Sequence, residues 1–264
     1  MTEPLSYEMI EASSLDGNSV LRLVLDRPRG NVLTLAMLRE LDTALAAHRD
    51  VPDLRLVVLR GAGGNFSYGA SVEEHRKEQA PELLKGFHQL VRSVAGYPVP
   101  IAALVEGACL GGGFEVVLCC HFVFATATAR FGCPEIQLGV FPPVLAAIGS
   151  QRLGSALAER LLLTGGTLDA AAAERLGLVT LLDGEGDPED ALLAWYRETL
   201  QPLSAFALRQ GIRASRVSSG WLAAFERSLA ASERQYLDEV LPSHDGNEGV
   251  EAFLAKRTPA WKNA

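Results

Sequence analysis

The chain has 264 residues, of which 48% are hydrophobic and 21% are charged, so it is long enough to bury a large core. It carries 24 basic and 32 acidic residues, for a formal net charge of −8, and no run of Lys or Arg stands out. This balance argues against nucleic acid or a membrane surface as a partner.

The N-terminal sequence MTEPLSYEMIEASS has no basic segment followed by an apolar one, and no apolar run of about 18 residues occurs in the chain. We therefore expect a cytoplasmic protein. The four cysteines, at positions 109, 119, 120 and 133, have apolar neighbours that suit buried, reduced thiols. Cys119, Cys120 and His121 are adjacent and point in different directions, and no second ligand pair has suitable spacing, so we expect no metal site.

The first two thirds of the chain predict alternating strands and helices. Thr34 caps the first helix, and the Gly-rich loop 61–70 follows the third strand. Ser71 and Glu74 have the spacing of a capping box, which predicts a further helix beginning at Ser71. In chain order, the other expected elements are strand 7–12, strand 20–25, helix 34–48, strand 54–59, helix 81–94, strand 99–105, helix 112–120, strand 121–125, helical segment 153–173 and strand 178–182.

After a polar turn at 183–187 the sequence predicts only helices, near 188–200, 203–216, 219–239 and 246–256. The expected layout is an α/β core over residues 1–187 and a helical region over residues 188–264.

Two glycine-rich turns follow two of the central strands: FSYGAS after LRLVVL, and GACLGGGFE after IAALVE. Glycine lets backbone N–H groups approach a ligand closely, and a helix start adds partial positive charge to them. The chain has no G-x-x-x-x-G-K-[ST] phosphate loop and no G-x-S-x-G nucleophile elbow, and Phe66 breaks the G-x-G-x-x-G pattern. An oxyanion hole of two single N–H donors is the more economical interpretation.

Two carboxylates follow these turns. Glu115 lies in the first turn of the helix that starts at Gly112, where it is either a catalytic group or a surface residue that stabilises the helix dipole. Glu135 lies in the apolar stretch FGCPEIQLGVFPP, where a buried charge is costly unless it is compensated. If the two carboxylates converge, one stays protonated while the other ionises, which suits the movement of a proton and a water near a carbonyl. His75 and His88 are interpreted as surface or lid residues rather than bases.

The motifs FSYGASVEE, VEGACLGGGFEVVL, FGCPEIQLGV and EGVEAFLAKR, in this order and spacing, resemble the enoyl-CoA hydratase/isomerase (crotonase) superfamily. The resemblance extends over essentially the whole chain. It implies an α/β fold of the ClpP/crotonase-like type, a spiral of ββα units with a C-terminal helical region that builds trimers or hexamers. It also implies an acyl-CoA thioester as the substrate, and no metal or redox cofactor.

The resemblance also implies roles for single residues. The N–H groups of Ala70 and Gly112 match the oxyanion hole, and Glu115 and Glu135 match the catalytic pair. Glu115 would activate the water, and Glu135 would carry the proton to and from carbon. Relatives with other chemistry often lack one glutamate, so the complete pair favours addition or elimination of water.

The residues that the resemblance assigns to CoA binding come from both ends of the chain. Arg29 would contact the phosphates, although a solvated turn explains it as well. The backbone at 70–72 would flank the adenine, and the two C-terminal residues match positions that reach a neighbouring subunit's CoA in the family. The complete set is Arg29, Ala70, Ser71, Val72, Phe253 and Lys256.

The expected acyl pocket contains Tyr68, His75, Phe87, Phe141 and Pro142. The sequence VFPP at 140–143 replaces a Gly-rich run of ordinary enoyl-CoA hydratases. Together with GASVEEH it resembles relatives that hydrate cyclohexa-1,5-diene-1-carbonyl-CoA, and a rigid Phe-Pro-Pro wall would hold a ring in register. The alternatives are a short- or branched-chain (methylglutaconyl-type) enoyl-CoA hydratase or dehydratase, and a crotonase-fold protein that binds acyl-CoA without turnover.

Overall fold

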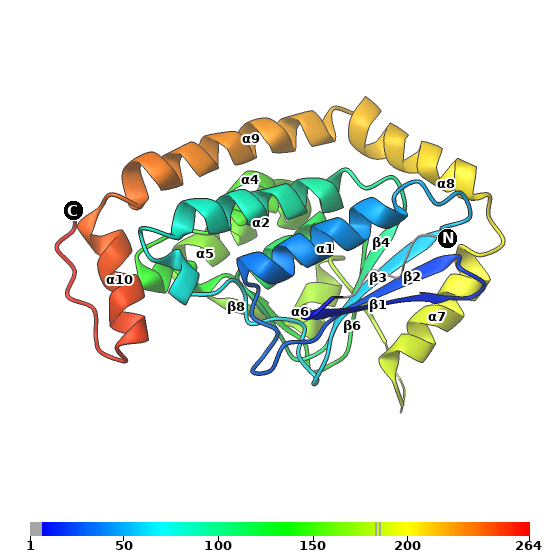
Figure 1. Cartoon of the computed structure of the whole chain (residues 1–264), viewed down its shortest axis with the longest axis horizontal. Coiled ribbons are helices and arrows are strands. Elements are labelled where there is room, and N and C mark those ends of the chain that lie inside the picture. Colours follow the sequence, from blue (N-terminus) through cyan, green and yellow to red (C-terminus); the bar gives the residue numbers. More distant parts are fainter. Residues whose placement is uncertain (1–6, 183, 185) are drawn as a thin grey trace.

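The core of the protein is a six-stranded sheet, accompanied by a separate three-stranded sheet, in a computed structural model that describes residues 7–182, 184 and 186–264 (Figure 1). The large sheet has the order β1-β2-β3-β4-β6-β9, with β1 and β2 antiparallel and the other neighbours parallel. In the small sheet β7 pairs in parallel with β5 and antiparallel with β8. The strands are β1 (Ile10–Leu15), β2 (Val20–Leu25), β3 (Leu56–Gly61), β4 (Ile101–Val105), β5 (Ala108–Leu110), β6 (Phe122–Ala125), β7 (Arg130–Gly132), β8 (Thr167–Asp169) and β9 (Thr180–Leu181).

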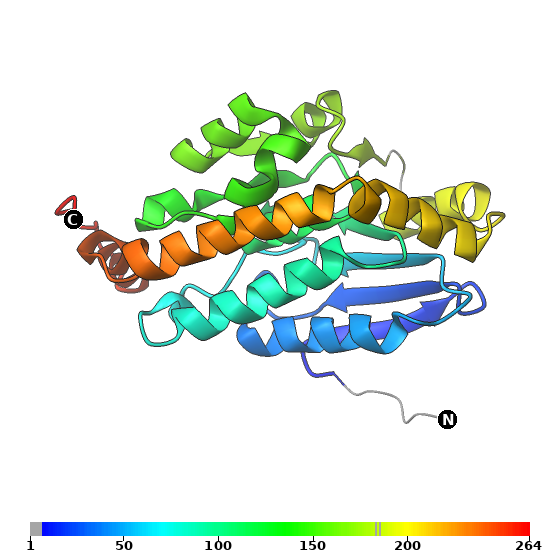
Figure 2. The ribbon, with the colours of Figure 1, turned by 90° about the horizontal axis from the view of Figure 1, so that it is seen from above.

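Helices cover both faces of the large sheet. On one face α1 packs against α2, and α9 runs along α4, so that α1, α2, α9 and α4 lie side by side (Figure 2). The helices are α1 (Leu35–His48), α2 (Ala80–Ala95), α3 (Gly112–Cys119), α4 (Pro143–Leu153), α5 (Ser155–Thr164), α6 (Ala170–Arg175), α7 (Pro188–Thr199), α8 (Ala205–Ile212), α9 (Trp221–Gln235) and α10 (His244–Leu254). Short 3₁₀ turns are η1 (Glu73–His75) and η2 (Pro134–Leu138), and π-helical turns are η3 (Arg213–Ser218) and η4 (Tyr236–Val240).

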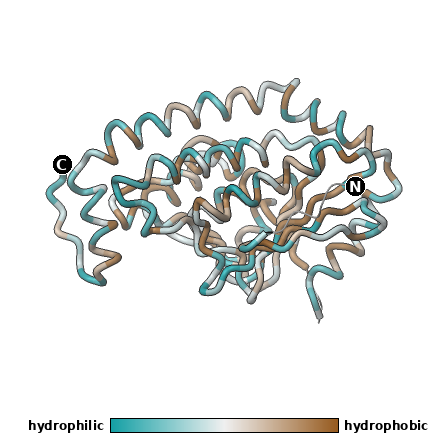
Figure 3. Tube along the Cα trace, viewed as in Figure 1, coloured by the Kyte–Doolittle hydropathy of each residue, from teal (hydrophilic) through white to brown (hydrophobic). Residues whose placement is uncertain are grey.

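The inner strands β2, β3 and β4 are largely apolar on both faces because both faces are covered, as is usual for a parallel sheet. Hydrophobic residues concentrate in these strands (Figure 3). In β2, Leu21 and Leu23 belong to the main core under α1, α2 and α9, whereas Val20 faces the opposite layer. That opposite layer is α7, which contributes Leu192 and Tyr196.

The α/β class predicted from the sequence is confirmed, but several boundaries differ. The first strand covers Ile10–Leu15 instead of 7–12, because β1 is an edge strand with mostly exposed side chains and so tolerates the polar residues Ser13 and Ser14. Strands β5, β7 and β8 were not predicted, since each has only three residues. The segment 153–173 is not one helix, because Gly165 adopts a left-handed conformation (φ 62°) that ends α5 before β8.

The helix predicted to begin at Ser71 is wrong. The Ser71 hydroxyl accepts a hydrogen bond from the Glu74 N–H at 3.4 Å, as in a capping box, but the Glu74 carboxylate does not return to Ser71. It accepts the N–H of Leu35 at 2.8 Å instead, at the start of α1. Only the short turn η1 forms, and Glu74 ties it to α1.

In the described part of the chain, no helix is long and apolar enough to cross a membrane. Within the chain, α7 packs on the sheet, and α9 buries Phe225 and Leu229 in the main core. Positions 1–6 of the N-terminal segment, and positions 183 and 185 of the polar turn, lie outside the described residues. The division at residue 187 and the assembly into trimers or hexamers stay predictions.

Candidate active site

Two backbone N–H groups, those of Ala70 and Gly112, lie side by side where the glycine-rich turns meet. A Cβ atom placed on Gly112 would lie 3.4 Å from the Ala70 nitrogen. The flanking Gly69 oxygen and Ser71 nitrogen bond to Leu33, each at 2.9 Å, so the Ala70 N–H points to the other side. The Gly112 N–H is the first of α3, where helices leave donors unpaired. In the described part of the chain neither N–H has an acceptor, so both are free to bind one carbonyl oxygen.

The close approach of the turns depends on two glycines with positive φ. Gly69 has φ 97°, and a Cβ there would lie 2.9 Å from the Leu110 oxygen. Gly111 has φ 49°, and a Cβ there would lie 2.7 Å from Oε1 of Glu135. Side chains at these positions would therefore displace the oxyanion donors or the carboxylate.

Glu115 lies in α3 with only 3% of its surface exposed. Its Oε1 accepts the N–H groups of Val144 at 2.7 Å and Leu145 at 2.9 Å, in the first turn of α4. Burial raises the pKa of Glu115 to about 7, while the two hydrogen bonds oppose this rise by stabilising the ionised form. Glu115 is therefore not the surface residue of the alternative interpretation, but a buried carboxylate that ionises near neutral pH.

Glu135 projects from η2 toward Gly111, and its environment differs from that of Glu115. Its Oε2 is buried without a hydrogen-bond partner in the described part of the chain. Burial raises the pKa of Glu135 well above its usual value, and the negative charge of Glu115 raises this pKa further. Of the two carboxyl groups, Glu135 therefore holds the proton more tightly.

The two carboxyl groups and the oxyanion donors line one cavity with about 30 Å³ of free space, enough for about one water molecule. The prolines at 142 and 143 form its rigid wall. The complete lining is Ala70, His75, Leu83, Leu84, Phe87, Gly112, Glu115, Glu135, Val140, Phe141, Pro142, Pro143 and Tyr236.

Two polar side chains complete the cavity wall. His75 Nδ1 lies 2.7 Å from the Ser71 oxygen, so Nδ1 carries the proton, and burial lowers the pKa of His75 so that the ring stays neutral. Tyr236 comes from η4 and packs edge to face on Phe141, with ring centroids 5.7 Å apart. Burial raises the pKa of Tyr236, as do the charges of Glu135 and Glu115. Both side chains are therefore neutral.

An open groove with about 560 Å³ of free space shares Ala70 with this cavity. Arg27 and Arg29 give it positive charge, and the exposed ring of Phe253 in α10 forms its opposite side. Its lining is Arg27, Pro28, Arg29, Val32, Tyr68, Ala70, Ser71, Val72, Glu73, Phe253 and Leu254. A groove that contains two arginines and shares the oxyanion donor Ala70 with the cavity suits a long anionic thioester.

A family model described as enoyl-CoA hydratase/isomerase matches residues 16–264. The chain belongs to this family. The cyclohexa-1,5-dienecarbonyl-CoA hydratase of Thauera aromatica is 43% identical over 245 residues, which cover 93% of each chain. The probable enoyl-CoA hydratase echA8 of Mycobacterium bovis is 35% identical over 248 residues, covering 90% of this chain and 93% of the relative. A solved enoyl-CoA hydratase from Mycobacterium avium subsp. paratuberculosis K-10 has a TM-score of 0.83 at 27% identity, covering 97% of this chain and all of that one.

These comparisons confirm the family resemblance and the crotonase fold, and the protein is an enzyme of the hydratase type. The structure brings most of the predicted site residues of this enoyl-CoA hydratase family member together. The four groups assigned to chemistry share one cavity with His75, Phe87, Phe141 and Pro142 of the expected acyl pocket. Arg29, Ala70, Ser71, Val72 and Phe253 of the expected CoA site line the adjoining groove.

Two placements, those of Tyr68 and His88, differ from the predictions, and the predicted contacts of two C-terminal residues with a neighbouring subunit stay predictions. Tyr68, expected in the acyl pocket, lines the groove with 51% of its surface exposed, because its ring packs over Gly30. Phe253 lines the groove of its own chain, and its contact with a neighbouring subunit's CoA stays a prediction. Lys256 is exposed beyond the end of α10 and does not line the groove of its own chain, and its contact with a neighbouring subunit's CoA stays a prediction. His88 is not a surface or lid residue but is fully buried, 2.7 Å from a Glu233 oxygen.

Sequence reasoning missed the two N–H groups of α4 that hold Glu115, and it missed Tyr236. Helical periodicity alone places Tyr236 on a helix, and no motif links it to residues about a hundred positions earlier. The N–H groups of Val144 and Leu145 were detectable in principle, since Pro143 is a strong signal for a helix start with free donors. In the described residues no group of three or more His, Cys, Asp or Glu side chains is arranged to hold a metal ion.

Proposed function

We propose that this enzyme adds water to a cyclic conjugated dienoyl-CoA thioester, with cyclohexa-1,5-diene-1-carbonyl-CoA as its substrate. The observation that carries the proposal is the unequal pair of buried carboxyl groups beside two free N–H donors. Glu115 has two hydrogen bonds that favour its ionised form, whereas Glu135 has a buried oxygen with none. The 43% identity to a relative with this substrate supports the choice of acyl group.

In this proposal the thioester carbonyl binds to the N–H groups of Ala70 and Gly112. These donors polarise the carbonyl and stabilise the negative charge that develops on its oxygen when water attacks. Removing one such donor typically raises the barrier by about 2.7–4 kcal/mol. Because the donors are fixed before the substrate arrives, no reorganisation is needed during the reaction.

Glu115, in its ionised form, accepts a proton from water as the oxygen forms a bond to the β-carbon. The double-bond electrons shift through the conjugated system, and Glu135 delivers its proton to the carbon at the far end. One C–O and one C–H bond form, and one O–H bond of water breaks. One of the two C=C bonds is lost, and the remaining C=C bond lies between the carbon that gains the hydroxyl and the carbon that gains the proton. The pair ends with the proton on Glu115, and its return to Glu135 completes the cycle. The reverse sequence eliminates water.

The ring requires a cavity of about 150 Å³, the size that holds a benzene-like molecule, and the walls enclose about 30 Å³. Substrate binding must therefore displace side chains. The prolines at 142 and 143 are rigid, so other side chains of the lining must move, among them Leu84, Phe141 and Tyr236. Aromatic faces that open around a flat ring favour a cyclic substrate over a short linear chain.

The proposal assigns the groove to CoA, with Arg29 near the phosphates and the backbone at 70–72 beside the adenine. Such chemistry needs no metal or redox cofactor, and dialysis against a chelator should leave the rate unchanged. We further propose that the enzyme is cytoplasmic and forms trimers or hexamers. Light scattering after size exclusion and fractionation of cells test these two points.

The deciding experiment compares cyclohexa-1,5-diene-1-carbonyl-CoA, crotonyl-CoA and methylglutaconyl-CoA by kcat/KM for water addition. We expect the cyclic substrate to be turned over fastest. A clear preference for crotonyl-CoA or methylglutaconyl-CoA would replace the cyclic assignment by a short- or branched-chain one. Binding of all three thioesters without turnover would make the protein a non-catalytic acyl-CoA-binding member of the family.

A further inference from the structure

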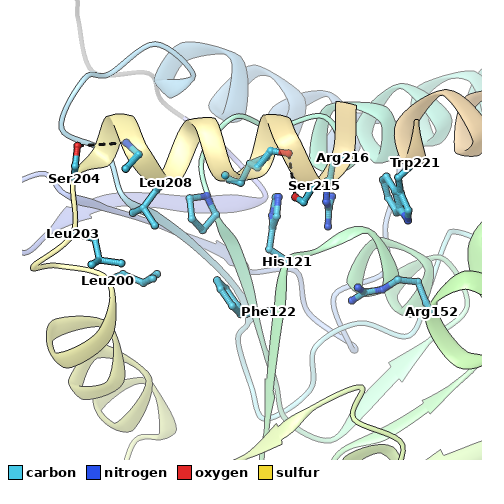
Figure 4. Close-up of a pocket in the computed structure, with 14 residues that line it drawn as sticks. His121, Phe122, Arg152, Leu200, Leu203, Ser204, Leu208, Ser215, Arg216 and Trp221 are labelled. Atoms are coloured by element: carbon cyan, nitrogen blue, oxygen red, sulfur yellow. Dashed lines mark hydrogen bonds between the residues drawn. The ribbon is translucent and has the colours of Figure 1, made fainter. Parts of the chain in front are cut away.

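A second large groove lies between α8, η3 and the core, away from the carboxylate pair (Figure 4). It has about 660 Å³ of free space, within the range of about 300–1,000 Å³ typical of small-molecule sites. Its lining contains no Asp or Glu. The lining residues are Pro100, His121, Phe122, Arg152, Leu200, Leu203, Ser204, Ala207, Leu208, Gly211, Ile212, Ser215, Arg216 and Trp221.

His121 offers the groove an N–H donor that has no acceptor among the described residues. The Ile101 N–H donates to Nδ1 of His121 at 3.1 Å, so Nδ1 is the acceptor and the proton of the neutral ring is on Nε2. Burial keeps the ring neutral by lowering its pKa to about 3, and the nearby charges of Arg216 and Arg152 act in the same direction. In the described part of the chain, Nε2 is buried without an acceptor.

Two arginines give the same groove positive charge. Arg152 donates to the Cys120 oxygen at 3.3 Å, and its Nε is buried with no acceptor among the described residues. Arg216 donates to the oxygens of Ala95 and Cys119, each at 2.8 Å, and lies 4.7 Å from the ring centre of Trp221. Across the described chain neither guanidinium forms an ion pair with a carboxylate.

The charged end and the apolar end of the groove are distinct. In Figure 4, Arg152 and Trp221 lie toward one end and Leu200, Leu203 and Leu208 toward the other, with His121 and Arg216 between them. The two hydroxyls are already engaged, since Ser204 accepts from the Ala207 N–H and Ser215 donates to the Ile212 oxygen. The buried polar groups of the groove without a partner in the described part of the chain are therefore two N–H donors, those of His121 and Arg152, beside a wall of leucines.

We propose that this groove binds an amphiphilic monocarboxylate, with its apolar body along Leu200, Leu203 and Leu208 and its carboxylate against Arg152 and His121. A carboxylate supplies the acceptors that the buried N–H groups lack, and a guanidinium recognises it with paired hydrogen bonds. The two N–H groups lie just under the groove wall, so binding requires a rotation of these side chains. An alkylammonium amphiphile, which has no acceptor, would leave both donors unpaired.

The site also has a mechanical connection to the catalytic cavity. Helix α3 begins at the oxyanion donor Gly112 and ends at Cys119, whose oxygen binds Arg216. Helix α4 begins with the N–H groups that hold Glu115 and has Arg152 in its last turn. A ligand in the groove therefore contacts the far ends of the two helices that position the oxyanion donor and the base.

Calorimetric titration of the whole protein with octanoate tests this proposal, with octylamine as the control of equal length and opposite charge. We expect octanoate to bind at least about tenfold more tightly than octylamine. Saturating free CoA should not compete, because the CoA groove is elsewhere. Equal binding of the two probes, no binding of octanoate, or its displacement by CoA would each overturn the proposal.

Two variants locate the site. Gly211→Leu places a side chain in the groove where a Cβ meets nothing within 4 Å, so it should abolish octanoate binding without straining the fold. Arg152→Met keeps the length of the side chain and removes its charge, so it should weaken binding at least about tenfold. Ala223→Leu, on the exposed side of α9, is the matched control and should bind normally. Unchanged binding in either groove variant would contradict the assignment, and a changed oligomeric state in Gly211→Leu would mark the groove as a contact between copies of the chain.

Discussion

Replacing Glu115 by Gln should make the folded protein more stable above neutral pH and, at the same time, greatly lower its hydration rate. Oε1 of Glu115 accepts both backbone hydrogen bonds, and the amide oxygen of Gln can keep them in the same position. What the substitution removes is a buried charge. The pKa of Glu115 rises from 4.5 to about 7 on folding, so ionising this group costs about 3 kcal/mol of stability at pH 8.

The sign of this effect sets its pH window. A carboxyl group whose pKa is higher in the folded state costs nothing well below pH 4.5, and the cost grows until the pH passes about 7. The advantage of Glu115→Gln over the native protein should therefore be about 1 kcal/mol at pH 5.5 and about 3 kcal/mol at pH 8. Urea unfolding at both pH values, at one fixed subunit concentration, measures the difference.

The exposed carboxylate Glu159 of α5 provides the control, since Glu159→Gln should change stability little at either pH. The same preparation of Glu115→Gln should lose about 10²-fold or more of its hydration rate, because the base is gone. In the native enzyme, kcat/KM should fall about tenfold per pH unit below pH 7, as Glu115 takes up a proton. A stability gain that is the same at both pH values, or a loss at pH 8, would refute the reasoning.

Three other substitutions test separate parts of the site. Glu135→Gln should lower turnover by about 10²-fold or more, measured as water addition, while titration shows unchanged CoA binding; full activity would remove this residue from the mechanism. Gly69→Ala should lower kcat by about 10²–10³-fold, because its Cβ would meet the Leu110 oxygen and shift the oxyanion donor. Gly63→Ala, also at positive φ but in open space, should keep normal kcat, and equal losses in both variants would point to backbone strain alone. Phe141→Ala should reduce the preference for the cyclic substrate over crotonyl-CoA by about tenfold or more, and an unchanged ratio of kcat/KM values would show that this ring does not select the substrate.

The parts of the fold that could be predicted from the sequence are those whose signal is local. Strand β2 and helix α1 have clear periodicity, and Thr34 caps α1 as expected, accepting the Met37 N–H at 3.4 Å. The capping box at Ser71 failed because the choice of partner for Glu74 is a tertiary matter. Its carboxylate can satisfy the N–H of Ser71 or that of Leu35, and Leu33 already binds the Ser71 N–H.

The site was predictable wherever a motif contains both the residue and its role. Ala70, Gly112, Glu115 and Glu135 all lie in such motifs, and the structure places them around one cavity. The environments that make the two carboxyl groups unequal are not readable from the motifs. They depend on the first turn of α4, whose N–H groups bond to Glu115, and on the lack of a hydrogen-bond partner for Oε2 of Glu135 among the described residues.

The C-terminal helices have a consequence for how this enzyme can be recombined. Residues 221–254 bury Phe225 and Leu229 in the core, contribute Tyr236 to the cavity that holds the acids, and end with Phe253 on the groove beside it. They are therefore not a module that can be exchanged independently of the core. A chimera that takes this segment from a relative would change a wall of the acyl cavity and a side of the neighbouring groove together. The preference for the acyl group and the affinity for the CoA portion of the substrate should therefore change together.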